Sequence, residues 1–326
     1  MENYLVTGAA GFIASRVIEI LLDMGHTVVG VDNMNDAYDV RMKEYRLKKL
    51  MYRPNFTFHL SDIADRKTFD SKSLLRQLPF AAVINLAARA GVRQSVENPW
   101  VYVDTNITGT LNLLEFCREQ NIPKLILAST SSVYGEKAPL PTPETASSDS
   151  PLQSYAATKK SAEVLCYSYH YLYGLDVTIF RYFTVYGPSP RPDMVMFRFT
   201  QWISEDRPVK INGNGEQSRG FTYVDDIARG TILGLKPLGY EIINLGGHEV
   251  ITINQLINML ESLTGKRAKI EYLPRHPADM AANWASIKKA GQLLNWVPTV
   301  GLQEGVSRLV DWYNQERSWA SQIITD

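Results

Sequence analysis

The strongest constraint on the fold is a regular alternation of short apolar segments and longer amphipathic ones over the first half of the chain. The short segments have the length and composition of buried strands: Tyr4–Val6, Thr27–Val31, Phe56–His59, Ala82–Leu86, Lys124–Ala128 and Asp176–Arg181. Helical periodicity is found between them, near residues 12–24, 38–50, 66–77, 100–120 and 154–173. Apolar strands that alternate with helices predict a parallel sheet covered on both faces, which is a doubly wound α/β (Rossmann) fold.

This regular alternation ends near residue 185. Prolines crowd a loop over residues 188–192, and shorter elements follow. Further helices are expected near residues 224–235, 252–264 and 301–317. We therefore expect residues 1–184 to form the first domain and residues 185–326 to form a smaller mixed α/β lobe, some segments of which return to the first domain. A substrate is expected at the seam, beyond the carboxyl ends of the strands.

Composition indicates an ordinary globular protein and argues against several kinds of partner. Of 326 residues, 34 are basic and 34 are acidic, so the formal net charge is zero. A general affinity for nucleic acid or for a membrane surface is therefore not expected. Cys117 and Cys166 lie in apolar helical patterns, which favours buried free thiols over a disulfide or a metal site. No run approaches the roughly 18 apolar residues of a membrane span, and no leader pattern is visible, so a cytoplasmic enzyme is expected.

A glycine-rich turn, TGAAGFIA over residues 7–14, follows the first predicted strand and opens the first predicted helix. Gly8 allows a tight turn, and Gly11 lets the backbone approach a diphosphate. Phe12 and Ile13 begin the helix, whose free N–H groups and positive dipole end favour an anion. The order of strand, glycine turn and helix predicts a dinucleotide site in the first domain.

An acidic residue, Asp32, ends the second predicted strand. A carboxylate there accepts hydrogen bonds from the adenosine ribose hydroxyls and repels a 2′-phosphate, which favours NAD over NADP. Arg16 on the first helix is the one nearby residue that would favour a phosphate instead. Other residues that follow strand ends are assigned to the same cofactor, with plain loop structure as the alternative: Asn33, Asp62, Ile63, Leu86, Ala87 and Ala88.

Tyr155 and Lys159 lie four residues apart in a predicted helix, so their side chains share one face. A free tyrosine titrates near pH ~10 and is a poor base at neutral pH, but a nearby cation lowers its pKa. The spacing alone also fits an exposed helix face. Beside a dinucleotide site, the pair indicates a base that removes a proton from a hydroxyl group.

Together these pieces resemble the extended short-chain dehydrogenase/reductase family of nucleotide-sugar enzymes. The resemblance spans nearly the whole chain and rests on TGAAGFIA, DNMNDAYD, LAARAGVR, STSSVYG, YAATK, RYFTVYGPSPRPDM, RGFTYVDD and RHPADM. It implies that Tyr155 is the general base, that Lys159 binds the nicotinamide ribose and lowers the pKa of Tyr155, and that Thr130 hydrogen-bonds the reacting hydroxyl. It also implies a homodimer formed by the helices near 100–120 and 154–173, although their apolar side chains would equally suit a core.

Ser131 and Ser132 discriminate between the reactions of that family. Members that eliminate water carry Asp-Glu here, and UDP-glucuronate decarboxylases typically keep the Glu, whereas this chain has no carboxylate at either position. The remaining reaction is 4-epimerisation of a UDP-sugar, and the motifs most resemble those of UDP-glucuronate 4-epimerases. Arg89 and Gly220 depart from that subgroup, which often has Gln and Asp there. The alternatives are a UDP-glucose or UDP-N-acetylglucosamine 4-epimerase, a UDP-glucuronate decarboxylase and, from another class, a non-catalytic NAD-sensing protein.

For a 4-epimerase, the resemblance implies a transient 4-keto sugar formed when Tyr155 takes the 4-hydroxyl proton and the C4 hydride passes to NAD. A 4-keto uronate is a β-keto acid that can lose CO₂, so its carboxylate needs a firm clamp. Arg191 is the predicted bidentate clamp, with an exposed loop cation as the alternative. The other predicted substrate-binding residues are Arg93, Ser131, Ser132, Thr184, Arg219 and Asp279. Arg275 and His276 compete for a phosphate-binding role, and the spacing fits His276 better.

Overall fold

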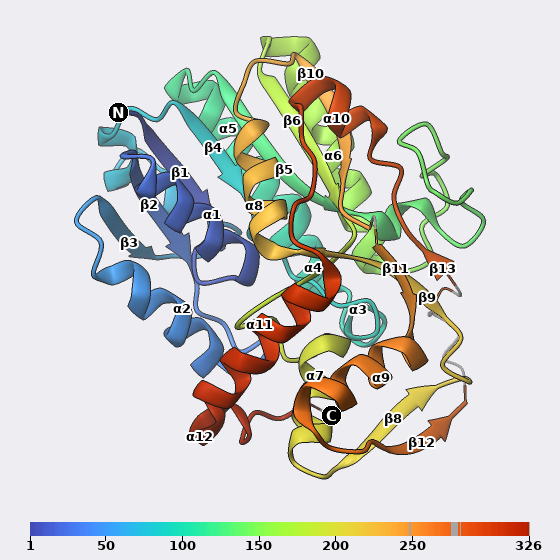
Figure 1. Ribbon diagram of the computed structural model, residues 1–326. Coiled ribbons are helices and arrows are strands. Elements are labelled where there is room, and N and C mark those ends of the chain that lie inside the picture. The colour runs from blue at the N-terminus through green and yellow to red at the C-terminus, as the bar shows by residue number, and fades with distance from the viewer. Residues whose placement is uncertain (248, 275–279, 281, 326) are drawn as a thin grey trace.

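Seven parallel strands form the central sheet of the computed structural model, which describes residues 1–247, 249–274, 280 and 282–325 (Figure 1). The strands lie in the order β10–β6–β5–β4–β1–β2–β3. Their bounds are β1 Asn3–Thr7, β2 Thr27–Asp32, β3 Phe56–Leu60, β4 Ala82–Asn85, β5 Lys124–Thr130, β6 Asp176–Tyr182 and β10 Tyr240–Leu245. The predicted doubly wound fold is confirmed, and six of these strands are those expected from the sequence.

The seventh strand, β10, was not predicted because Glu241 and Asn244 interrupt its apolar run. It pairs in parallel with β6 at the edge of the sheet. Asn244 is fully buried there, yet its side chain is satisfied, since Nδ2 donates to the Thr142 carbonyl (3.0 Å) and Oδ1 accepts from the Tyr134 hydroxyl (2.7 Å). A buried amide with both ends bonded fits a strand, but a hydrophobicity pattern cannot reveal this.

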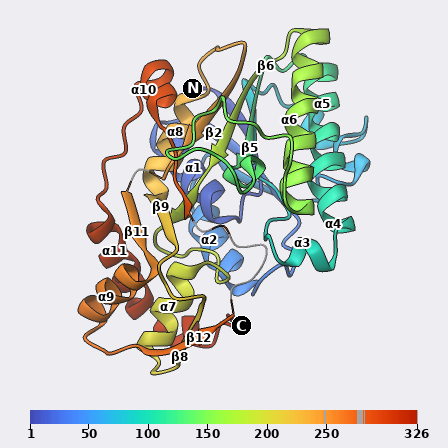
Figure 2. The same cartoon turned by 90° about the vertical axis from the view of Figure 1, so that its right-hand side faces the viewer.

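Helices cover both faces of the sheet, as Figure 2 shows. Their bounds are α1 Phe12–Asp23, α2 Arg41–Met51, α5 Gly109–Gln120, α6 Ser154–Tyr173 and α8 Val224–Leu233. Successive residues of a strand face opposite sides, so Val6 packs in the core with α1, α2 and α8 while Leu5 packs in the core with α5 and α6. Cys117 and Cys166 lie in the second of these cores as buried free thiols, as expected.

Two predicted helices differ from expectation. The segment near 66–77 contains two short 3₁₀ turns, η1 Arg66–Phe69 and η2 Leu74–Gln77. Asp65 and Ser73 accept hydrogen bonds from main-chain N–H groups two residues later, which offers the backbone an alternative to a continuous α-helix. The helix near 100–120 contains a π-helical segment, η3 Val103–Thr108, between α4 Trp100–Tyr102 and α5. Such segments frequently occur at functional sites.

The later part of the chain adds smaller sheets and helices beside the carboxyl edge of the main sheet (Figure 1). One sheet has the order β11–β9–β13 with β7 beside β9, and another pairs β12 with β8. The strands are β7 Thr184–Tyr186, β8 Pro208–Asn212, β9 Ser218–Tyr223, β11 Glu249–Thr252, β12 Lys269–Leu273 and β13 Ala282–Asn283. The helices are α7 Val195–Ser204, α9 Ile253–Thr264, α10 Lys288–Leu294, α11 Leu302–Gln315 and α12 Arg317–Ala320.

Several segments beyond residue 184 lie with the first sheet, among them α8, β10 and α10. Helix α8 packs against α1, and β10 extends the sheet beyond β6. The core on this face of the sheet also continues into the later lobe, where Phe197, Leu256 and Val306 belong to the same buried cluster as Val6. The domain boundary at residue 184 stays a prediction.

Candidate active site

The glycine turn between β1 and α1 brings the backbone close to a neighbouring strand end. Gly8 has a φ of +70°, and a Cβ at this position would lie 2.8 Å from the Ala87 Cα. Gly11 precedes α1 and provides no side-chain cap for its first N–H groups. These N–H groups can therefore bind an anion at the positive end of the helix. The turn fits the diphosphate of a dinucleotide, as the sequence predicted.

Asp32, at the carboxyl end of β2, is buried and has a second task beyond the predicted ribose contact. Its carboxylate accepts hydrogen bonds from the backbone N–H groups of Ala10 (3.1 Å) and Met34 (2.8 Å), so it shapes the glycine turn itself. The Lys43 ammonium lies 3.7 Å from the same carboxylate. Arg16 binds Asp225 and Glu19 instead, which argues against its alternative role with a 2′-phosphate.

A pocket at this edge of the sheet gathers nine of the predicted cofactor residues from the ends of four strands. They are Gly8, Gly11, Asp32, Asn33, Asp62, Ile63, Leu86, Ala87 and Ala88. Phe12 and Ile13 begin α1 next to this pocket without lining it. The Asn33 amide donates to the Asp62 carboxylate at 2.8 Å, which joins the loops after β2 and β3. These contacts give the adenosine end of a dinucleotide a polar, preformed rim.

Thr130 and Tyr155 meet across the carboxyl end of β5. Thr130 is the last residue of β5, Tyr155 lies in the first turn of α6, and their side chains lie close enough for Thr130 to influence the pKa of the Tyr155 hydroxyl. Burial raises the pKa of the Tyr155 hydroxyl above its ordinary value, while the Thr130 side chain and the Arg191 charge act in the opposite direction. Lys159, which the resemblance implies would lower this pKa, is not among the groups that act on it here, and its role stays a prediction.

Lys159 follows Tyr155 by one turn and is only 2% exposed. Burial lowers the pKa of its ammonium to about 8, and the negative charge of Glu163 opposes that shift. Within the described chain, this lysine does not line the cofactor pocket. It lies on the same helix face as Tyr155, as the spacing predicted.

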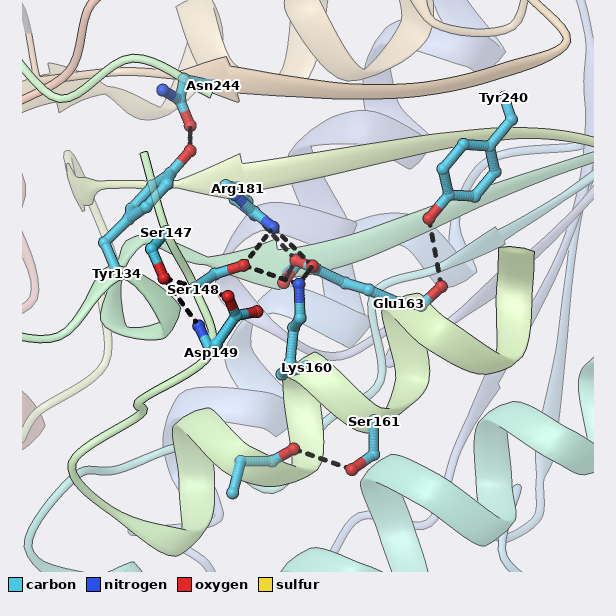
Figure 3. A network of polar contacts seen from close by, with 12 residues as sticks. Tyr134, Ser147, Ser148, Asp149, Lys160, Ser161, Glu163, Arg181, Tyr240 and Asn244 are labelled. Carbon is cyan, nitrogen blue, oxygen red and sulfur yellow. Dashed lines mark hydrogen bonds and ion pairs between the residues drawn. The ribbon is translucent and has the colours of Figure 1, made fainter. Parts of the chain in front are cut away.

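A buried ion pair holds α6 against the sheet one turn beyond Lys159 (Figure 3). The Glu163 carboxylate accepts hydrogen bonds from Arg181 Nε (2.9 Å) and Nη2 (2.7 Å), and the Arg181 side chain comes from β6. It also accepts a hydrogen bond from Ser129 (2.5 Å), the neighbour of Thr130 on β5. The pair therefore links α6, the helix that carries Tyr155, to β6 and to β5, the strand that ends in Thr130.

The π-helical segment supplies a second link to α6. Asn106 in this segment bonds both the N–H (2.9 Å) and the carbonyl (3.0 Å) of Arg89, and its amide also donates to Thr158 (3.0 Å) between Tyr155 and Lys159. Its position in the helix therefore fixes the loop after β4 relative to α6. Asn106 was not predicted, because a π segment cannot be recognised from apolar spacing.

Arg191 is partly buried and lies in the same pocket, which argues against an exposed loop cation. Its guanidinium is already paired: Nε donates to Asp193 Oδ1 at 3.0 Å, and Nη2 donates to Asp193 Oδ2 and to the Ala90 carbonyl (3.4 Å). Arg191 was predicted to bind a carboxylate of the substrate, but in the structure it binds a carboxylate of the protein, that of Asp193. Asp193 was not among the predicted site residues.

Arg46 on α2 connects the loop of Arg191 to the glycine turn. Its guanidinium donates to the carbonyls of Ser189 (2.9 Å), Pro190 (2.9 Å) and Ala10 (3.1 Å). Arg46 is 4% exposed and falls between the buried Met42 and Leu50 at four-residue spacing. Arg46 was not predicted as a site residue. The pattern that could have revealed it is a charged residue on a helix face that is otherwise apolar.

The remaining predicted substrate residues lie on several elements. Ser131 and Ser132 form a 3₁₀ turn after β5 (η4 Ser131–Tyr134), and Ser131 accepts a hydrogen bond from Asn283 at 3.0 Å. Thr184 begins β7, and Arg93 precedes α3 Gln94–Glu97. Arg219 on β9 donates to the Met280 carbonyl at 2.6 Å. Arg275, His276 and Asp279 lie outside the described residues.

Ser131 and Asn283 face a second cavity, also lined by Tyr134, Thr142 and Met280. This cavity lies where the end of β5 meets the later lobe, on the side expected for a substrate. Asn283 was not predicted, because it lies on a strand of only two residues.

The chain is similar to known enzymes over nearly its whole length. It is 58% identical to the UDP-glucuronate 4-epimerase of Thermodesulfobacterium geofontis, over 96% of each chain. The crystal structure of UDP-glucuronic acid 4-epimerase from Bacillus cereus, in complex with UDP-glucuronic acid and NAD, superimposes with a TM-score of 0.87, 39% identity and coverage of 96% of this chain and 99% of that one. The UDP-glucose 4-epimerase of Thermotoga maritima gives a TM-score of 0.88 at 32% identity, over 97% and 99%.

Residues 4–246 also match the family described as NAD dependent epimerase/dehydratase. This match covers most of the chain and includes the glycine turn, Asp32, Thr130, Tyr155 and Lys159. The family assignment made from the motifs is confirmed. The protein belongs to the NAD-dependent epimerase/dehydratase family.

Proposed function

We propose that this protein is an NAD-dependent 4-epimerase that interconverts UDP-glucuronate and UDP-galacturonate. The observation that carries the proposal is the meeting of Thr130, Tyr155 and Arg191 at the carboxyl edge of the sheet, with serines at positions 131 and 132. A phenol, a hydroxyl partner and a guanidinium suit the oxidation of a sugar hydroxyl beside a carboxylate. The names of similar proteins, UDP-glucuronate 4-epimerase and UDP-glucuronic acid 4-epimerase, support the same substrate.

In this mechanism Tyr155 takes the proton of the sugar 4-hydroxyl while Thr130 holds the same oxygen. Burial disfavours the ionised phenol, so Tyr155 depends on neighbouring positive charge to act as a base. Bound NAD would supply the hydride acceptor and donor for C4, and its oxidised nicotinamide would supply positive charge beside Tyr155. The glycine turn and Asp32 would hold this cofactor between turnovers, since the reaction has no net oxidation.

The serines at positions 131 and 132 limit the reaction to epimerisation. A serine hydroxyl is too weak an acid to protonate a leaving hydroxyl at neutral pH and too weak a base to remove a C5 proton. The acid and the base that dehydration requires are therefore missing at these two positions. Arg191 would anchor the substrate carboxylate in an orientation that disfavours loss of CO₂. Ser131, Ser132, Thr184 and Arg93 are proposed to complete the sugar site, and Arg219 the diphosphate site.

We also propose that the chain forms a homodimer through α5 and α6, which lie side by side on one face of the molecule (Figure 2). Large apolar side chains are exposed along these helices: Leu111, Val164, Tyr167, Tyr171 and Leu172. Other apolar side chains of the same helices, such as Leu113 and Leu114 on α5, do belong to the core, so the alternative left open by the sequence holds for them. No helix of the described chain is long and apolar enough to cross a membrane, and a cytoplasmic location stays a prediction.

Tyr155→Phe tests the general base. The variant keeps the ring and its edge contact with Tyr102 (6.2 Å between centroids) but loses the hydroxyl. We expect kcat for UDP-glucuronate epimerisation, followed by NMR of the product, to fall by about 10²- to 10⁴-fold with the NAD content unchanged. Near-normal turnover of the variant would contradict the assigned role. Wild-type protein that retains NAD but turns over no UDP-sugar would favour the NAD-sensing alternative.

Arg191→Ala tests the carboxylate anchor. For UDP-glucuronate we expect kcat/KM to fall by about 30-fold or more, because a charged partner of the carboxylate is lost. For UDP-glucose, which has no carboxylate, we expect a change of less than about threefold. An equal loss with both substrates would remove Arg191 from carboxylate recognition. Assay of released CO₂ in the same reactions separates epimerase from decarboxylase activity.

Lys159→Met tests the cost of burying the lysine. Because the folded pKa is lowered to about 8 from 10.5, folding disfavours the charged form, and the methionine variant should gain about 3 kcal/mol in unfolding free energy at pH 7. The unfolded chain binds more protons between these two pKa values, so wild-type stability rises with pH there and the gap closes toward pH 10.5. Urea denaturation of nucleotide-free protein measures both effects.

Lys160→Met is the matched control, because Lys160 is the next residue of the same helix and is more exposed. We expect its substitution to change the unfolding free energy by less than about 1 kcal/mol at any pH in this range. A lower stability of Lys159→Met at pH 7 would show that the buried ammonium contributes favourably to folding.

Tyr171→Glu tests the proposed dimer. Tyr171 on α6 is 77% exposed, and a carboxylate there would have to be buried against a second copy. We expect sedimentation velocity to show a shift from dimer to monomer with an unchanged far-UV circular dichroism spectrum. Tyr52→Glu is the matched control, since Tyr52 is equally exposed but follows α2. Identical sedimentation of both variants and wild type would place the interface elsewhere.

A further inference from the structure

Asp193 binds N–H groups of Arg191 that a substrate carboxylate would also need. In the sequence Arg191-Pro192-Asp193, the two charged side chains pair with each other through both carboxylate oxygens. Both residues line the cofactor pocket. The acid is therefore presented to the guanidinium from within the same short loop.

The donors of Arg191 show why the two carboxylates compete. A guanidinium offers two forks to a carboxylate, one from Nε with Nη2 and the other from Nη1 with Nη2. Asp193 fills the first fork, and Nη2 also donates to the Ala90 carbonyl at 3.4 Å. Nη2 belongs to both forks and already has two acceptors. A second carboxylate can therefore make a two-bond contact with Arg191 only if one of these acceptors leaves.

The backbone beside Arg191 is held more firmly than its ion pair. Arg46 binds the two carbonyls that precede Arg191, and Arg46 itself is buried. By contrast, the side chains of Arg191 and Asp193 are 25% and 30% exposed, so their attraction is screened by water. Of the two acceptors of Nη2, the Ala90 carbonyl belongs to the backbone and Asp193 is a side chain. The exchange that leaves the backbone in place is therefore the one in which the Asp193 side chain moves away.

We infer that Asp193 is an internal competitor for Arg191, and that UDP-glucuronate binds by displacing the Asp193 carboxylate with its own. The inference rests on the proposed function, in which Arg191 anchors the uronate carboxylate. A neutral UDP-sugar has no group with which to displace Asp193, so it leaves the ion pair closed. Asp193 thereby keeps a pocket cation satisfied in the empty site and sets how tightly a uronate is held.

Asp193→Asn tests this inference, because it removes the charge and keeps the shape. An ion pair of ordinary, partly exposed strength is closed about four-fifths of the time, so its loss should tighten UDP-glucuronate binding about fivefold. UDP-glucose binding should change by less than about twofold. Titration calorimetry of the NAD-loaded enzyme with each nucleotide sugar measures both affinities. Asp193→Ala is the second variant if the amide variant does not accumulate as folded protein.

The opposite results would overturn the inference. Weaker UDP-glucuronate binding by Asp193→Asn would make Asp193 a residue that orients Arg191, and unchanged binding would mean that it does not compete. In the Arg191→Ala background, Asp193→Asn should have no effect on UDP-glucuronate affinity, and a retained gain would contradict the proposed route through Arg191. Failure of the proposed function is distinguished by the wild type, which would then not epimerise UDP-glucuronate.

Discussion

The buried ion pair between Arg181 on β6 and Glu163 on α6 is the contact on which the geometry of the site most depends. Both side chains are excluded from solvent, and removal of one partner would leave an uncompensated charge at a cost of about 3–5 kcal/mol. Because Ser129 shares the same carboxylate, the pair joins α6 to β5 as well as to β6. The distance between the Tyr155 phenol and the Thr130 hydroxyl is thereby determined by packing inside the domain, before any ligand binds.

A second set of contacts places the substrate loop relative to the cofactor turn. Arg46 binds carbonyls from both, so a shift of the glycine turn would also move the loop that carries Arg191. Positioning is thus done by buried arginines, Arg46 and Arg181, whose partners are fixed. The Arg191 guanidinium, which is proposed to meet the substrate, has the more exposed and exchangeable pair. Rigid support with one adjustable contact suits a site in which a sugar ring must turn between two hydride transfers.

Much of this organisation is readable from the sequence because it depends on local rules. Apolar periodicity predicts the first six strands, and the glycine turn before α1 follows from the need for a positive φ at Gly8. Asp32 is found because an acidic residue at the end of the second strand is typical of a ribose-binding position. The predicted secondary structure is wrong where a buried polar side chain finds its hydrogen-bond partners through tertiary contacts, as Asn244 does in β10. It is also wrong where local hydrogen bonds from side chains interrupt a helix, as at Asp65 and Ser73.

The sequence by itself predicted the fold class, the cofactor turn and the pairing of Tyr155 with Lys159, since these follow from periodicity and spacing along single elements, while Thr130 came from the family resemblance. Only the tertiary structure decided their electrostatic state. Burial raises the pKa of Tyr155 and lowers that of Lys159, and the spacing of a tyrosine and a lysine on one helical turn does not reveal these effects. The pairing of Arg191 with Asp193 was likewise decided by the folded loop, because a charge's partner depends on distance in space and on exclusion of water.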